Sequence, residues 1–136
     1  MPPRIDVSKL DSTEKIKAIN GLRRGDVITV NLTRGAVGKE LRKLRPCVVV
    51  SRDDINKNQD TIIVVPLTTH DGDPQPKPYE VPIAAGEGDL DKAGVATPFK
   101  LRNIDPAERV VEIWGRLSDV TMRKIEEQLA YDLGMV

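Results

Sequence analysis

The residues best suited to chemistry stand at the ends of two short apolar runs. Arg45 precedes the run Cys47 to Val50, and Thr68 and Thr69 follow the run Ile62 to Leu67. β-Branched side chains favour strands, so each run predicts a strand with polar residues at one end. If the two strands pair, the guanidinium of Arg45 and the threonine hydroxyls meet at one rim. A guanidinium is a forked donor suited to phosphate oxygens, although an arginine paired with an acidic residue at a strand start is the structural alternative.

Three further side chains near these runs carry functional groups. Ser51 and His70 follow the two strands and are weaker candidates for the same cleft, where a neutral imidazole suits a general base. His70 beside Asp71 and Asp73 also invites a metal, but a solvated turn is the simpler interpretation. Cys47, the single cysteine, is interpreted as a small buried hydrophobe. One histidine and one cysteine provide no transition-metal ligand set, so we expect no metal and no cofactor.

The segment before the first run is strongly basic. The chain as a whole has a formal net charge of zero, so it provides no long-range attraction for nucleic acid. A basic loop on a neutral protein can still hold phosphates locally, with affinity that falls as salt rises. A solvated loop is the alternative. Between Thr33 and Arg45 the only acid is Glu40, and the basic residues are Arg34, Lys39, Arg42, Lys43 and Arg45 itself.

The other predicted elements define a framework around these runs. A capping box, Asp11-Ser-Thr-Glu14, begins a helix that stops at Gly21. Ser118 begins a second helix, and its apolar stripe is Met122, Ile125, Leu129 and Leu133. Strands are predicted over 26–32, 79–83, 94–101 with an interruption at Pro98, and 110–117, and loops are predicted over 52–60 and 70–78. The expected fold is mainly β (α+β): a small antiparallel barrel or strongly curved sheet with N-terminal and C-terminal helices.

The composition is that of one globular domain. The chain has 136 residues, 39% of them hydrophobic and 31% charged. No apolar run reaches the length of a membrane span, and the start lacks the apolar segment of a signal peptide. We therefore expect a cytoplasmic protein without a membrane partner. Aromatic residues make up only 3%, so Trp114 is interpreted as core or interface filler and not as a base-stacking platform.

Four motifs occur in a characteristic order: Arg24-Gly-Asp-Val27, Gly38 to Pro46 followed by Val48 to Ser51, Ile63 to Thr68, and Gly115-Arg-Leu-Ser118. In order and spacing they resemble the MazF/PemK-type endoribonuclease toxins of toxin–antitoxin systems. The similarity covers 23–136 and leaves 1–22 as an N-terminal extension with a short helix. It implies an SH3-like small barrel, a homodimer and a cognate antitoxin. It also implies metal-independent, sequence-specific cleavage of single-stranded RNA, giving a 2′,3′-cyclic phosphate, with no DNA substrate.

The resemblance also assigns roles to residues. The arginine of the family's Arg-Pro-Val-Val motif is catalytic, and Arg45 matches it. Thr68 matches the Thr or Ser whose hydroxyl contacts the scissile phosphate. Weaker candidates for RNA binding are Lys39, Arg42, Lys43, Ser51, Thr69, His70, Phe99 and Arg102.

One position departs from the family pattern. Many members carry an acidic residue where this chain has Phe99. Either Arg45 and Thr68 suffice, or activity is weak or lost, and Phe99 can instead stack an unpaired base. The alternative function is therefore a non-catalytic RNA-binding protein or protein inhibitor on the same fold. A gyrase poison of the CcdB type is less favoured, because those toxins have a Trp-containing tail and this chain ends Leu133-Gly-Met-Val136.

Overall fold

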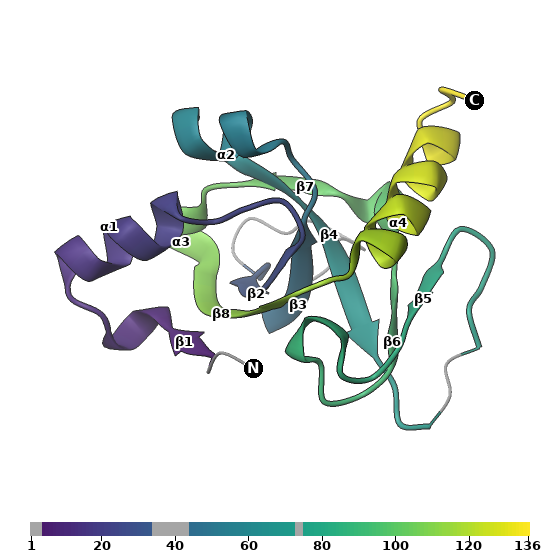
Figure 1. The fold of residues 1–136 in the computed structure, drawn as a ribbon, viewed down its shortest axis with the longest axis horizontal. Helices are drawn as coiled ribbons and strands as arrows, with labels where there is room; N and C mark the ends of the chain where they lie inside the picture. Colours follow the sequence, from purple (N-terminus) through teal and green to yellow (C-terminus); the bar gives the residue numbers. More distant parts are fainter. Residues whose placement is uncertain (1–3, 34–43, 73–74) are drawn as a thin grey trace.

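An antiparallel sheet is the centre of the computed structural model, which describes residues 4–33, 44–72 and 75–136 (Figure 1). Its strands pair in the order β1-β8-β2-β3-β4-β6-β5, with β7 beside β4. The described strands leave the sheet open, with β1 and β5 at its two ends, so the expected barrel is not closed. The strands are β1 (Ile5–Asp6), β2 (Asp26–Asn31), β3 (Leu44–Val49), β4 (Ile62–Thr69), β5 (Val81–Ile83), β6 (Gly94–Ala96), β7 (Arg102–Ile104) and β8 (Val110–Arg116).

The two main helices begin at the predicted caps. The side chain of Asp11 accepts a hydrogen bond from the backbone N–H of Glu14 at 2.8 Å, and both halves of the capping box are present. The hydroxyl of Ser118 accepts from the backbone N–H of Thr121 at 3.2 Å. The helices are α1 (Ser12–Asn20), α2 (Asp53–Asn58), α3 (Pro106–Arg109) and α4 (Asp119–Asp132), with 3₁₀ turns η1 (Val7–Lys9), η2 (Glu87–Asp89) and η3 (Pro98–Lys100). The described segments contain no helix long and apolar enough to cross a membrane.

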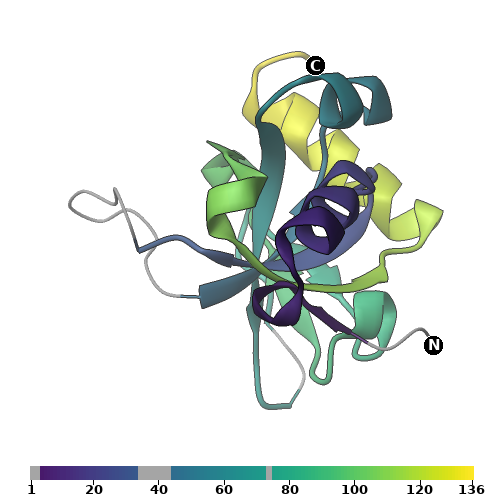
Figure 2. The ribbon, with the colours of Figure 1, turned by 90° about the vertical axis from the view of Figure 1, so that its left-hand side faces the viewer.

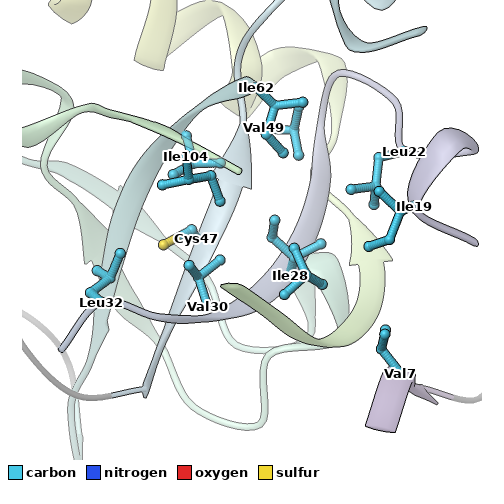
Figure 3. Packing of buried hydrophobic residues seen from close by; sticks show 12 residues of the cluster. Val7, Ile19, Leu22, Ile28, Val30, Leu32, Cys47, Val49, Ile62 and Ile104 are labelled. Carbon is cyan, nitrogen blue, oxygen red and sulfur yellow. The ribbon is translucent and has the colours of Figure 1, made fainter. Parts of the chain in front are cut away.

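Each face of the sheet carries its own hydrophobic core, because side chains alternate along a strand. In Figure 2, α1 stands in front of the strands and α4 behind them. The core on the α1 side is shown in Figure 3; it includes Ile28, Cys47 and Ile62 from the strands. The core on the α4 side joins strand residues such as Val48 to Met122 and Ile125 of the helix. The mainly β fold with N-terminal and C-terminal helices is confirmed.

Three local predictions are wrong. The 52–60 loop contains the short helix α2, and the strand predicted over 94–101 ends at Ala96 and does not resume after Pro98, because Pro98–Lys100 forms the 3₁₀ turn η3. Leu133 does not continue the buried stripe of α4, because the helix ends at Asp132 and Leu133 is 56% exposed. Residues next to a helix end are therefore poorly placed by periodicity alone.

The N-terminal extension packs onto the rest of the chain. Strand β1 pairs with β8, and Val7 and Ile19 are buried in the core on the α1 side. The guanidinium of Arg4 lies 3.6 Å from the ring centroid of Trp114 and forms an ion pair with Asp89 at 3.1 Å. Half-buried Trp114 is thus a packing residue. The division of the chain at residue 22 stays a prediction.

Candidate active site

The pairing of β3 with β4 brings Arg45 and Thr68 together. Cys47 lies opposite Pro66 in this antiparallel ladder, so continuing the register by two residues places Arg45 opposite Thr68. Opposed residues in a sheet point to the same face. The Nη1 atom of Arg45 lies 3.5 Å from the Thr68 hydroxyl oxygen, and both residues are half-buried. The expected rim of guanidinium and hydroxyl is present in the structure.

Strand β6 holds Thr68 from its other side. Val95 pairs with Thr68, and Gly94 pairs with Thr69. A Cβ atom at Gly94 would clash with the carbonyl oxygen of Thr68. The close approach of the two strands therefore depends on glycine, and it fixes the backbone that carries the Thr68 hydroxyl.

The guanidinium of Arg45 has an unused donor. Its Nε atom is buried and has no hydrogen-bond partner within 4–33, 44–72 and 75–136. A buried donor without an acceptor carries a desolvation penalty. A bound anion with several oxygens, such as a phosphate, offers acceptors to the forked guanidinium. The geometry of Arg45 and Thr68 is therefore suited to an anionic oxygen group.

Arg102 is on the same face of the sheet as Arg45. It pairs with Val64 across β4 and β7, and its Nη1 atom donates to the carbonyl of Leu32 at 3.3 Å. Both guanidinium groups act electrostatically on the thiol of Cys47, which lies on this face. The structure thus places Arg102 near Arg45, in agreement with a contribution to the same positive region.

Cys47 itself is excluded as a nucleophile by its environment. Burial raises the pKa of the Cys47 thiol from 9.0 to about 12, although Arg102 and Arg45 both act to lower it. A thiol is nucleophilic only as the thiolate. This cysteine is therefore a core residue, as the sequence predicts.

The remaining candidates are placed in different regions. Thr69 and His70 are exposed directly after Thr68, and the backbone N–H of His70 donates to the carbonyl of Ala93 at 2.9 Å. Phe99 is in η3, on the side of the sheet where α4 packs, and not beside Arg45. Lys39, Arg42 and Lys43 lie outside the described residues. No group of three or more His, Cys, Asp or Glu residues in the described part of the chain can hold a metal ion.

Ser51 is not brought to this rim. It lies six residues beyond Arg45, which along a strand is about 20 Å. Its buried hydroxyl accepts from the backbone N–H of Ile63 at 3.0 Å and donates to Asn56, whose amide returns a bond to the Ser51 carbonyl at 3.0 Å. These bonds join the end of β3 to α2, so we leave Ser51 out of the candidate site.

The open antiparallel sheet with an Arg–Thr pair at one rim places the chain among small β-rich proteins. The sequence model of one family, described as "PemK-like, MazF-like toxin of type II toxin-antitoxin system", matches residues 23–132. The chain belongs to this family of toxins.

Solved structures show the same fold. MazF (Form-I) from Deinococcus radiodurans has a TM-score of 0.72 and 23% identity, covering 84% of this chain and 97% of that one. An endoribonuclease in complex with its cognate antitoxin, from a mycobacterial species, has a TM-score of 0.64 and 23% identity, covering 85% and 95%. A MazE–MazF complex (Form-II) from Deinococcus radiodurans has a TM-score of 0.62 and 20% identity, covering 85% and 97%. At this level of identity the comparison supports the fold alone.

Proposed function

We propose that this toxin is a metal-independent, sequence-specific endoribonuclease that cleaves single-stranded RNA and leaves a 2′,3′-cyclic phosphate and a 5′-hydroxyl. The observation that carries the proposal is the 3.5 Å approach of the Arg45 guanidinium to the Thr68 hydroxyl. Family membership and the mycobacterial neighbour described as an endoribonuclease support it.

The proposed reaction is an intramolecular transesterification. The 2′-hydroxyl oxygen forms a bond to the adjacent phosphorus after losing its proton, and the bond to the 5′-oxygen breaks as that oxygen gains a proton. Arg45 neutralises the charge that develops on the phosphorane oxygens, and the Thr68 hydroxyl donates to one of them. His70, exposed two residues after Thr68, is our candidate for the base that accepts the 2′-hydroxyl proton, and solvent water supplies the proton to the leaving 5′-oxygen.

The proposed partners follow from the same site. We propose a homodimer in which the basic segments of both subunits face one groove. A cognate antitoxin would occupy that groove with a disordered acidic segment, because a cationic cleft for phosphates also complements carboxylates on a flexible chain. Sedimentation at micromolar concentration tests the dimer, and a monomer mass would contradict it.

Incubation of the purified protein with a long RNA in EDTA tests the reaction. We expect cleavage at a recurrent short sequence, with cyclic phosphate and 5′-hydroxyl ends identified by end-group analysis. Cleavage that stops in EDTA and returns with a divalent ion would contradict the metal-independent mechanism. Cleavage products with 5′-phosphate ends would contradict the transesterification.

A non-catalytic RNA-binding role is the second candidate, favoured by one observation. Phe99 is an exposed apolar side chain at the position where many family members carry an acidic residue. The same experiment separates the two candidates, since RNA that is bound and remains intact would support the binding role.

A further inference from the structure

A pocket of about 430 Å³ lies beside the C-terminal half of α4, and nothing in the proposed reaction uses it. Its lining consists of Tyr79, Phe99, Tyr131 and Asp132. The chain has one phenylalanine, two tyrosines and one tryptophan, so three of its four aromatic residues are in this pocket. Tyr79 is 49% exposed, Phe99 52% and Tyr131 56%. Large aromatic rings left in water at one place are typical of an interaction site.

The backbone conformation of Tyr79 supports the interpretation of this pocket as a binding site. Its φ angle is 72°, in the left-handed region that bulky side chains rarely adopt. Such strained residues concentrate at binding and catalytic sites. The strained conformation places the Tyr79 ring against that of Tyr131, with centroids 6.0 Å apart and planes inclined by 22°. The chain therefore holds these two rings nearly parallel at the expense of local backbone strain.

The polar groups of the pocket point to a particular ligand. Oδ1 of Asp132 accepts from the amide of Gln128 at 2.8 Å, whereas Oδ2 is buried without a donor among the described residues. A ligand with N–H groups on its edge can supply the missing donor. The Nζ atom of Lys100 lies 5.8 Å from the Phe99 ring centroid. At this position it can form an ion pair with the phosphate of a nucleotide whose base stacks on Phe99.

We propose that this aromatic pocket binds one unpaired nucleobase of the RNA. Single-stranded bases are recognised by stacking on aromatic rings and by hydrogen bonds to their edges. The rings of Tyr79 and Tyr131 are inclined by only 22° and are about half exposed, so an unpaired base can stack on the open face of either ring. Asp132 then selects bases with an N–H edge, and Lys100 favours the nucleotide over a cationic side chain.

The pocket is separate from the Arg45–Thr68 rim, because Phe99 lies on the side of the sheet where α4 packs and Arg45 lies on the face of Cys47, on the α1 side. Arg102, three residues after Phe99, pairs with Val64, which precedes Thr68 by four residues, or about 13 Å along β4. An RNA strand that occupies both places passes from one face of the sheet to the other. This inference rests on the proposed RNA function and adds a position that selects the sequence.

Nucleoside monophosphates test the pocket without any need for cleavage. We expect AMP, GMP and CMP, titrated into the protein, to shift the ring-proton NMR signals of Phe99 and the two tyrosines upfield. The Trp114 signal provides an internal control, because that ring packs under Arg4 and is not part of the pocket. N-Acetylarginine amide is the rival probe. Ring shifts with this cation and none with the nucleotides would overturn the proposal in favour of a cationic side chain of a protein partner.

Binding of a short fluorescent single-stranded RNA, measured by anisotropy in EDTA, tests the same pocket in the full substrate. Phe99→Ala and Tyr131→Ala should each raise Kd about tenfold, the scale of losing one base stack. Tyr131→Phe should retain binding, and Asp132→Asn should change the relative affinity for RNAs that differ in one base. Ile16→Ala is the matched control, since Ile16 is 61% exposed on α1 and is not among the residues that line the pocket. Thermal unfolding of each variant shows whether the substitution has disrupted the fold.

Two outcomes separate failure of the pocket from failure of the proposed function. If folded Phe99→Ala and Tyr131→Ala proteins bind RNA as the wild type does, the pocket holds no base and the proposed nuclease is unaffected. If the wild-type protein binds neither RNA nor nucleotides, both proposals are overturned.

Discussion

At the level of single residues, Arg45 combines two properties that a surface arginine lacks. Its Nε atom is buried and has no hydrogen-bond acceptor among the described residues. Its Nη1 atom lies 3.5 Å from the Thr68 hydroxyl oxygen. A group held in this way is oriented before the substrate arrives, so little reorganisation is needed as charge develops. A positive charge alone does not provide this orientation, because a lysine ammonium lacks the planar, forked set of donors of a guanidinium.

Replacement of Arg45 should therefore affect the chemical step strongly. We expect Arg45→Ala to lower the single-turnover cleavage rate by about two to three orders of magnitude, the scale of losing one transition-state donor. Arg45→Lys should recover only part of that loss. The rates are measured with a fluorescent RNA in EDTA, and circular dichroism of each variant controls for folding. An unchanged rate in Arg45→Ala would place the active site elsewhere.

Cys47 provides a second prediction at this scale. Because burial raises its pKa to about 12, the native thiol should react with a thiol reagent far more slowly than the unfolded chain at mildly alkaline pH. The folded pKa is higher than the unfolded value, so the thiol stabilises the fold below pH 9.0, and this contribution is lost as the pH rises from 9.0 to about 12. Rapid labelling in native buffer would show that the core around β3 opens.

At the level of elements, the sequence predicts helices and strands best where neighbouring residues alone determine the structure. The caps at Asp11 and Ser118 satisfy backbone N–H groups that every helix start leaves free, so they mark the starts of α1 and α4. β-Branched runs identify β3 and β4, and the register of those strands then places Arg45 opposite Thr68. Both expectations depend on neighbours in sequence or on adjacent strands.

The sequence predicts least where distant segments meet. Helix α2 lies in a polar segment that a turn explains equally well, and its position depends on bonds between Ser51 and Asn56. The aromatic pocket joins Tyr79 to Tyr131, which are far apart in the chain, and neither tyrosine has a neighbouring motif that signals it. Of the four residues that line this pocket, the sequence singles out Phe99.

Glu87 connects η2 to the start of α4, which are distant in sequence, and its substitution tests this connection. Its carboxylate accepts from the backbone N–H of Ser118 at 2.9 Å, from the Ser118 hydroxyl at 2.8 Å and from the Thr121 hydroxyl at 2.7 Å. Burial raises the pKa of Glu87, but the hydrogen bonds from Ser118 and Thr121 outweigh it and the pKa is lowered below 4.5. The ionised carboxylate therefore holds η2 against the start of α4.

Glu87→Gln should lower the free energy of unfolding by about 1 kcal/mol at neutral pH, a value reduced for partial solvent exposure. Because the folded pKa is depressed, the contribution is present above pH 4.5 and is lost as the pH falls through the folded pKa. Urea unfolding of both proteins at pH values above and below 4.5 measures the difference. Glu127→Gln, an exposed change on α4, is the control. A difference that stays constant with pH would argue against a role of the charge.

At the level of the whole molecule, the formal net charge of zero makes local charge decisive. A neutral protein attracts RNA and an acidic partner only where its own charges are segregated, and here that segregation is in the basic segment before β3. The proposed antitoxin and the proposed substrate then compete for the same cations. Neutralisation by occupation of the groove needs no conformational change in the toxin.

Charge reversal distinguishes this mechanism from indirect neutralisation. We expect replacement of Lys39, Arg42 and Lys43 by glutamate to weaken RNA binding and antitoxin binding together, since both ligands lose the same attraction, and rising salt should weaken each in the wild type. The control reverses three exposed residues elsewhere in the chain, Lys9, Lys17 and Arg123, and changes the net charge equally. Both affinities are measured by titration at two salt concentrations. If antitoxin affinity survives the first triple reversal while RNA binding is lost, the two ligands occupy separate sites and the antitoxin must act indirectly.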